Sequence, residues 1–137
     1  MCLVRPMNAV AVADLSPGEA VLSERDVARH CATLAAGEPL ESVAVIEIDG
    51  HMVVRDGNNR VRAYVEHCRA RGQDPGTIPC VPSTARPPGP AALDGLRKMA
   101  RYYGTGPDAF AAMPVASPDQ YETMQTEVAR KIYREAN

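Results

Sequence analysis

The segment Arg55-Asp56-Gly57-Asn58-Asn59-Arg60 combines residue types that bind anions in proteins. It follows an apolar, strand-like run and precedes a helical pattern, so a strand should end and a helix begin at Gly57. The first N–H groups of a helix lack partners within the helix, and the positive end of the helix dipole lies there. Gly57 lets the backbone approach a ligand closely, and Asn58 is a favourable N-cap residue. The sequence therefore predicts an anion site at this junction.

Side chains in and after this segment add positive charge and hydrogen-bond donors. Asn59 and Arg60 fall in the first helical turn, where an amide and a guanidinium fork can contact a docked anion. Between Arg55 and Arg71, five arginines stand against two acidic residues, a local excess of three positive charges that includes Arg62. We therefore count Arg60 and Arg62 among the predicted phosphate-binding residues.

A purely structural interpretation of the same segment stays open. Gly57 would then serve the turn, Asn58 would cap the helix, and Arg60 and Arg62 would be solvated. The segment is not the longer GxxxxGK[ST] loop of nucleotide-binding proteins, so spacing alone does not decide between the two interpretations.

Composition describes one globular domain of modest size. The chain has 137 residues, 45% of them hydrophobic, with 15 Lys and Arg against 17 Asp and Glu. The net charge of −2 argues against a general binder of nucleic acids, which needs many basic residues to neutralise phosphates. Long apolar runs are missing and Met1–Val12 lacks signal-peptide features, so we expect a cytoplasmic protein without membrane contact.

Cysteines and histidines do not form metal or redox motifs. The four cysteines contain no CxxC pair, and the three histidines fall on different predicted elements. We expect reduced, mostly buried thiols and no metal site built from histidine.

The elements that must position the junction can be predicted from local patterns. Asn8–Leu15 alternates like a short strand and is followed by the turn signal Ser16-Pro17-Gly18, with Glu19 directly after it. Ser23, three residues before Asp26, resembles a capping box at the start of a helix that closes near Gly37.

The strongest local signal is a β-hairpin. Val43–Ile48 and Met52–Val54 are β-branched apolar runs separated by Asp49-Gly50, the pair that a two-residue type I′ turn prefers. The helix after Gly57 should end near Gly72. Ile78–Val81 then reads as a short strand, in which Pro79 favours a sheet edge or the first strand positions.

A proline-rich break, Pro87–Pro90, divides the chain into a domain at 8–86 and a helical C-terminal extension at 87–137. We expect this extension to be an appendage of helices without strands. One apolar stripe runs from Leu93 to Tyr103, and a second helix, begun by Ser117–Gln120, carries another. The stripes should pack against the domain or against a second copy of the chain, which makes a homodimer one expected partner arrangement.

Together these elements predict an α+β fold: a small mixed β-sheet with packed helices, plus the C-terminal helical extension. The order of the elements from Asp14 to Val81, the Pro17-Gly18-Glu19 turn, the VAVIEIDGHMVV hairpin, the DGNNRVRAY segment and IPCV resemble the ParB/sulfiredoxin-like superfamily. About half the chain is covered. In this superfamily the equivalent junction binds nucleotide phosphates, so the resemblance implies ATP, ADP or CTP as the ligand.

Two branches of the superfamily fit less well. Sulfiredoxins carry a reactive cysteine where this chain has Asn58, so the resemblance does not extend to sulfinic-acid reduction. ParB partition proteins continue into a large helix-turn-helix domain, whereas about 47 residues follow the proline break here. Specific DNA binding is therefore not expected.

The nearest pattern is that of the free-serine kinases, which pair a P-x-E segment with DGHHR or DGHTR. By this resemblance Glu19 is the base that accepts the proton of a small hydroxyl-bearing acceptor. Backbone amides and Arg60 would hold the transferring phosphate, and Asp56 would ligate or orient Mg²⁺. The implied activity is a phosphotransferase or a nucleotide hydrolase. Without the resemblance, Glu19 reads as a solvated loop carboxylate and Asp56 as a turn cap.

A second function class stays open, because Asn58 and Asn59 stand where the kinases carry histidines and neither amide titrates. The chain would then be a non-catalytic regulatory or protein-interaction module that acts through its helical tail. A DNA-associated ParB-like accessory protein is the third alternative.

Overall fold

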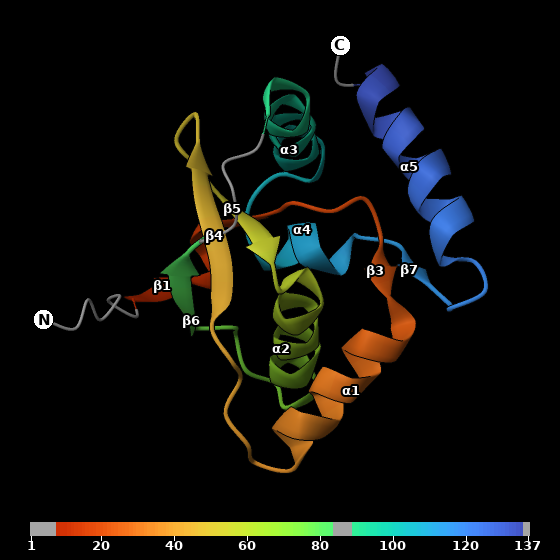
Figure 1. Ribbon diagram of the computed structural model, residues 1–137. Coiled ribbons are helices and arrows are strands. Elements are labelled where there is room, and N and C mark those ends of the chain that lie inside the picture. Colours follow the sequence, from red (N-terminus) through yellow and green to blue (C-terminus); the bar gives the residue numbers. More distant parts are fainter. Residues whose placement is uncertain (1–7, 84–88, 136–137) are drawn as a thin grey trace, which may run out of the picture.

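The computed structural model describes residues 8–83 and 89–135 and has mixed α and β structure (Figure 1). Its strands are β1 (Asn8–Ala11), β2 (Leu15–Pro17), β3 (Leu22–Ser23), β4 (Val43–Ile48), β5 (His51–Asp56), β6 (Thr77–Pro82) and β7 (Val115–Ala116). Its helices are the 3-10 turn η1 (Val12–Asp14), α1 (Glu24–Ala35), α2 (Asn58–Ala70), α3 (Pro90–Tyr103), α4 (Pro107–Ala111) and α5 (Tyr121–Glu135).

Five strands form the main sheet in the order β1-β6-β4-β5-β2. The β4–β5 and β1–β6 pairs are antiparallel, whereas β6 runs parallel to β4 and β2 parallel to β5. The predicted hairpin is confirmed: Asp49 and Gly50 both have positive φ angles, 51° and 82°, as a type I′ turn requires. The expected α+β class with a mixed sheet is therefore confirmed.

The predicted first strand is divided in two. The turn η1 interrupts the alternating run, and Ser16-Pro17, which we expected to be a turn, belongs to the edge strand β2. Proline is tolerated at a sheet edge because one side of the strand needs no ladder hydrogen bond. Pairing with β5, a tertiary interaction, thus overrides the local turn signal.

Of the two positions predicted for Pro79, the sheet edge is not the one observed, since β6 lies between β1 and β4; Pro79 stands instead in the first half of the strand. The register explains why proline is accommodated. β4 pairs with β6 only from Cys80 onward. Pro79 therefore has a partner strand on one side alone, where it lies opposite Ala9 of β1.

Helices α1 and α2 pack against each other beside the sheet and enclose the main core. As predicted, α1 begins at the Ser23 cap, and Gly37 follows it in a left-handed conformation. Val27, Cys31 and Leu34 of α1 pack together in the main core. The main core also includes the largest buried side chains of the strands and of α4, namely Leu15, Leu22, Val43, Val54, Ile78 and Phe110.

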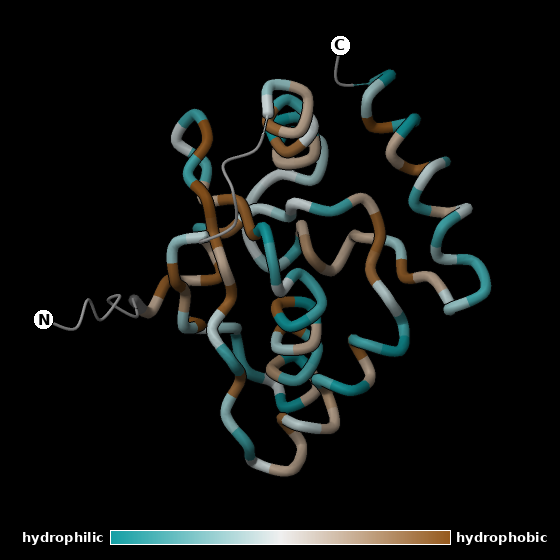
Figure 2. Tube along the Cα trace, in the orientation of Figure 1, coloured by the Kyte–Doolittle hydropathy of each residue, from teal (hydrophilic) through white to brown (hydrophobic). Residues whose placement is uncertain are grey.

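The C-terminal residues are built into the body, contrary to the expected appendage. β7 pairs in parallel with β3, and Phe110 and Met113 belong to the main core. The expectation of helices without strands is therefore wrong. We expected the apolar stripes of α3 and α5 to pack either against the domain or against a second copy of the chain. In the structure they pack against the domain. Figure 2 shows hydrophobic and hydrophilic residues alternating along α5, which matches a helix with one packed face.

Two further details concern the C-terminal part. Residues 117–120 form a turn and α5 begins at Tyr121, later than predicted. Pro87 and Pro88 of the predicted break lie outside the described residues. In the described part of the chain, no helix is both long and apolar enough to cross a membrane.

Candidate functional site

The strand–helix junction at Gly57 is present and depends on glycine. Gly57 has φ 110°, and a Cβ atom there would lie 2.6 Å from Cγ1 of Val43. Gly57, not the predicted Asn58, is the N-cap residue of α2. Because Gly57 has no side chain, no side-chain group caps the first N–H groups of the helix.

Asn58 is fully buried and hydrogen-bonded to the protein itself. Its Oδ1 accepts from the Gly18 N–H at 3.1 Å, and its Nδ2 donates to the Val54 carbonyl at 3.0 Å. The side chain thus joins the end of β5 to the segment after β2. Gly18 fits this close approach because it lacks a Cβ, which would lie 2.2 Å from the Val54 oxygen. Asn58 therefore holds the site together instead of capping the helix.

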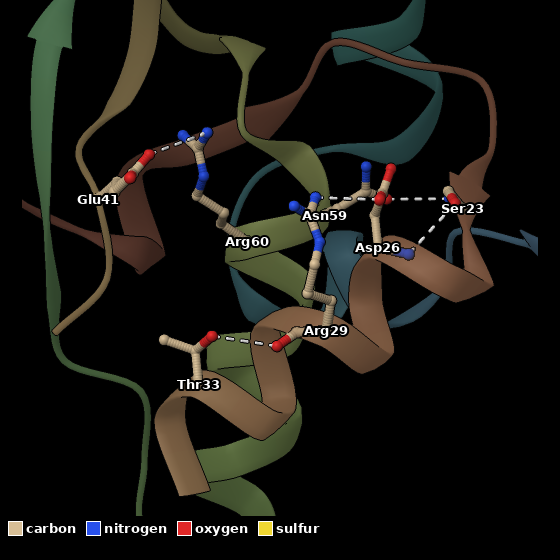
Figure 3. A network of polar contacts seen from close by, with 7 residues as sticks. All are labelled: Ser23, Asp26, Arg29, Thr33, Glu41, Asn59 and Arg60. Carbon is tan, nitrogen blue, oxygen red and sulfur yellow. Dashed lines mark hydrogen bonds and ion pairs between the residues drawn. The ribbon is translucent and has the colours of Figure 1, made fainter. Parts of the chain in front are cut away.

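Asn59 links the N-terminal ends of two helices (Figure 3). Its Oδ1 accepts from the Ser23 N–H at 2.9 Å, while the Ser23 hydroxyl accepts from the Asp26 N–H at 3.3 Å. Ser23 caps α1 and Asn59 stands in the first turn of α2, so the positive ends of both helix dipoles are directed to one region.

Arg60 turns toward the segment that precedes β4 (Figure 3). It donates to the Ser42 carbonyl at 3.0 Å and lies 3.7 Å from the Glu41 carboxylate. With Arg29 and His30 it lines a cavity of about 300 Å³ between α1 and residues 38–41. Burial, then the charges of Arg29 and Arg60, lower the pKa of His30, whereas the charges of Asp26 and Glu41 act in the opposite direction.

Arg62 does not reach the junction, and this corrects the prediction that Arg62 binds phosphate. Its guanidinium donates to the carbonyls of Phe110 and Met113, both at 2.9 Å, and lies 3.4 Å from Glu66. The reason is helical geometry: residues two apart are separated by about 200° around the axis, so Arg60 and Arg62 project to opposite sides.

Glu19 lies near the N-terminal end of α2, because the neighbouring Gly18 N–H donates to Asn58 and both Asn58 and Asp56 act on the Glu19 carboxyl. Burial raises the pKa of its half-buried carboxyl, the negative charges of Asp56 and Asp26 raise it further, and a hydrogen bond from Asn58 opposes them. A carboxyl shifted in this direction accepts a proton closer to neutral pH. The Pro17-Gly18-Glu19 and DGNNR segments therefore meet in space.

Asp56 ends β5 and is exposed, within electrostatic range of Glu19. Carboxylate oxygens are suitable ligands for Mg²⁺ together with phosphate oxygens, so the donor types fit the expected ion. Within residues 8–83 and 89–135, no three His, Cys, Asp or Glu side chains are grouped as a metal site. Cys31, Cys68 and Cys80 are free thiols, and Cys2 lies outside the described residues.

Sequence reasoning did not assign two residues near Glu19 to the site. Asp26 was interpreted only as part of a helix cap, although its charge acts on both Glu19 and Tyr121. Tyr121 falls in the helix predicted to begin at Ser117–Gln120, whose apolar stripe we expected to pack against the domain or a second copy of the chain. For Asp26 the cap pattern itself placed it near the start of α1, whereas no local pattern connects Tyr121 with Glu19.

Comparisons with protein-family models, curated proteins and solved structures gave no match.

Proposed function

We propose that this chain binds nucleotide phosphates and acts as a small-molecule phosphotransferase or nucleotide hydrolase of the ParB/sulfiredoxin-like type. The observation that carries the proposal is the position of Glu19. A half-buried carboxyl lies beside Asn58 and Asp56 at the N-terminal end of α2, where the helix N–H groups lack a side-chain cap.

Each part of this arrangement has a chemical use. The first N–H groups of α2 would hold a phosphate of ATP, ADP or CTP, and the Arg60 guanidinium would add positive charge nearby. Glu19 would accept the proton of a small hydroxyl-bearing acceptor or of water. Asp56, with the phosphate oxygens, would hold Mg²⁺, which neutralises charge on the transferring group.

Binding is tested first, by a thermal-shift panel of nucleoside mono-, di- and triphosphates with Mg²⁺. The variants are Arg60→Ala and, as control, Arg71→Ala at the exposed far end of α2. At 100 times its dissociation constant a nucleotide stabilises the protein by about 2.7 kcal/mol, which moves the melting temperature by several degrees. We expect this ligand-induced shift in the wild type and in Arg71→Ala, and its loss in Arg60→Ala. An equal shift in all three proteins would exclude Arg60 from the site.

Turnover is tested second, with Glu19→Gln. We expect this variant to keep the ligand-induced thermal shift while product formation falls by about 10²-fold or more, the usual contribution of a general base. A Glu19→Gln variant with wild-type turnover would contradict the assigned role.

One observation favours a second candidate, a non-catalytic binding or regulatory module. Asn58, Arg60 and Arg62 all donate hydrogen bonds to backbone carbonyls of the protein itself, so these side chains already have structural roles. This alternative predicts nucleotide binding by the wild type without product, with or without Mg²⁺.

A further inference from the structure

A second cavity, of about 500 Å³, lies among the C-terminal elements. Figure 1 shows α3, α5 and the chain that runs from α4 to β7 around one region of the molecule. The cavity is lined by Tyr102, Tyr103, Ala112, Pro114, Val128 and Lys131. Sites for small molecules usually measure about 300–1,000 Å³, so a ligand of one or two rings fits here. No described lining residue belongs to the proposed phosphate site, so the two sites are separate.

Two tyrosines give the cavity a wall that suits a flat apolar group. The ring centroids of Tyr102 and Tyr103 are 5.1 Å apart, and their planes meet at 84°. Aromatic rings prefer to stack with an offset or to meet edge to face. A planar ring seated against this pair would stack on one tyrosine and meet the edge of the other. Pro114 and Val128 add apolar surface, so the lining favours an aromatic ligand.

The tyrosine wall is in place before a ligand arrives. The Tyr103 hydroxyl donates to the Ala20 carbonyl at 2.5 Å, and the Tyr103 side chain packs against two clusters of the core. A ring that is already fixed loses little conformational entropy on binding. Tyr102 is 37% exposed, so part of its surface is open to a ligand.

Lys131 supplies the charge of this lining. Within residues 8–83 and 89–135, its ammonium takes part in no hydrogen bond or ion pair. Lys98 of α3, by contrast, pairs with Asp94 at 3.1 Å and lies over the Tyr133 ring. An unpaired ammonium beside apolar surface attracts an anion and repels a cation. One ammonium balances one negative charge, so a carboxylate fits better than a phosphate dianion.

The helix dipole of α3 orients such a ligand. Tyr102 and Tyr103 stand in the last turn of α3, where the partial charge of the helix is negative. An anionic group should therefore lie on the α5 side, beside Lys131, and the ring on the α3 side.

We propose that this cavity binds a small aromatic carboxylate. The ring packs against Tyr102 and Tyr103, and the carboxylate lies beside the Lys131 ammonium. This site is independent of the proposed nucleotide site, so a thermal-shift panel without a nucleotide response leaves it unaffected.

The test is an NMR titration of the wild type with three probes that share one ring system. The probes are the anion 2-naphthoate, the neutral 2-naphthamide and the cation 2-naphthylmethylammonium. We expect saturable binding of 2-naphthoate, with amide shifts concentrated at residues 102–103, 112–114 and 128–131. The affinity should fall from the anion to the neutral probe to the cation, by up to about fivefold per step, the range of a solvent-accessible ion pair.

Matched variants separate the charge from the rings. Lys131→Met should lower the affinity for 2-naphthoate to that for 2-naphthamide. Arg130→Met removes the neighbouring charge, which lines a different surface depression with Glu122 and Glu127, and should leave both affinities unchanged. Tyr102→Ala should weaken both probes by about fivefold, the value of a lost aromatic contact. Tyr133→Ala, which removes the other exposed tyrosine, should weaken neither.

Three results would overturn the proposal: no saturable binding of 2-naphthoate, equal affinities for the anion and the cation, or unchanged binding in Tyr102→Ala. Amide spectra verify that each variant keeps the fold. If Tyr102→Ala unfolds, Ala112→Phe decides. Ala112 is exposed at the end of α4, so a larger side chain there fills the cavity and should abolish binding. Wild-type affinity in Ala112→Phe would place the ligand elsewhere and exclude this cavity.

Discussion

Glu19 is a residue whose ionisation opposes folding. Its pKa is raised in the folded protein, so the folded state binds a proton more readily than the unfolded chain. The resulting cost to stability is absent below the ordinary pKa of glutamate. It grows as pH rises from that value to the raised one, and it is fully present above it.

We therefore predict that Glu19→Gln is more stable than the wild type at pH 7 and that the difference disappears near pH 4. Urea unfolding at both pH values measures it. Glu47→Gln, which changes an exposed carboxyl on β4, is the matched control. Equal behaviour of the two variants would show that Glu19 has no special environment.

Asn58 illustrates how a motif residue can be structural. The sequence indicated a helix cap, since asparagine is favoured there. In the structure its amide is buried and satisfies one N–H and one carbonyl, from two different segments. Leaving such groups unpaired costs about 1–3 kcal/mol each, which is enough to explain an asparagine at this position without a ligand.

At the scale of elements, Arg62 connects α2 to the end of α4. Its guanidinium donates to two carbonyls there, and its side chain is 15% exposed. Arg69, about two turns further along α2, pairs with Asp108 of α4. The Arg69 side chain is 45% exposed and the Asp108 side chain is 97% exposed. Arg62 and Arg69 therefore both connect α2 to the α4 region, Arg62 from a mostly buried position and Arg69 from a solvent-exposed one.

We predict that Arg62→Met lowers the free energy of unfolding by about 2–3 kcal/mol, because charge-assisted bonds to carbonyls are lost and those carbonyls stay buried. Arg69→Met should cost less than about 1 kcal/mol, as for other exposed ion pairs. Chemical denaturation of both variants checks the comparison. Similar losses in both would mean that burial does not distinguish the two contacts.

Several bonds tie the C-terminal elements to the Glu19 segment. Tyr103 of α3 donates to the Ala20 carbonyl at 2.5 Å, and Leu22 donates to the Pro114 carbonyl at 2.9 Å. Burial raises the pKa of Tyr103 to about 12, so this phenol stays protonated and remains a donor over the whole physiological range. The segment that follows Glu19 is thus held on both sides of Val21 by residues beyond 100 in the sequence.

At the scale of the whole molecule, the C-terminal residues should be required for folding. A fragment ending at residue 89 would lack Phe110, Met113 and the β7 partner of β3. Loss of a buried phenylalanine side chain alone costs about 3–5 kcal/mol, a large part of the 5–15 kcal/mol that stabilises a typical domain.

We predict that this fragment has no cooperative urea transition, whereas the full chain unfolds in a single one. Circular dichroism and the dispersion of amide NMR signals measure both. A fragment with dispersed signals and a sigmoidal transition would show that the first 89 residues fold independently.

The sequence alone determined the features whose causes lie within a few residues. The Asp49-Gly50 hairpin, the Ser23 cap, the strand–helix change at Gly57 and the apolar faces of the helices all follow from local backbone preferences and side-chain periodicity. These forces act between neighbours in the chain, so a pattern of residue types is sufficient to reveal them.

The tertiary structure decided which of these parts meet. The pairing of β3 with β7, the strand at Ser16-Pro17 and the direction of Arg62 depend on partners that are distant in sequence. Long-range contacts depend on the shapes of whole elements and on burial shared among them, and no local spacing encodes that information.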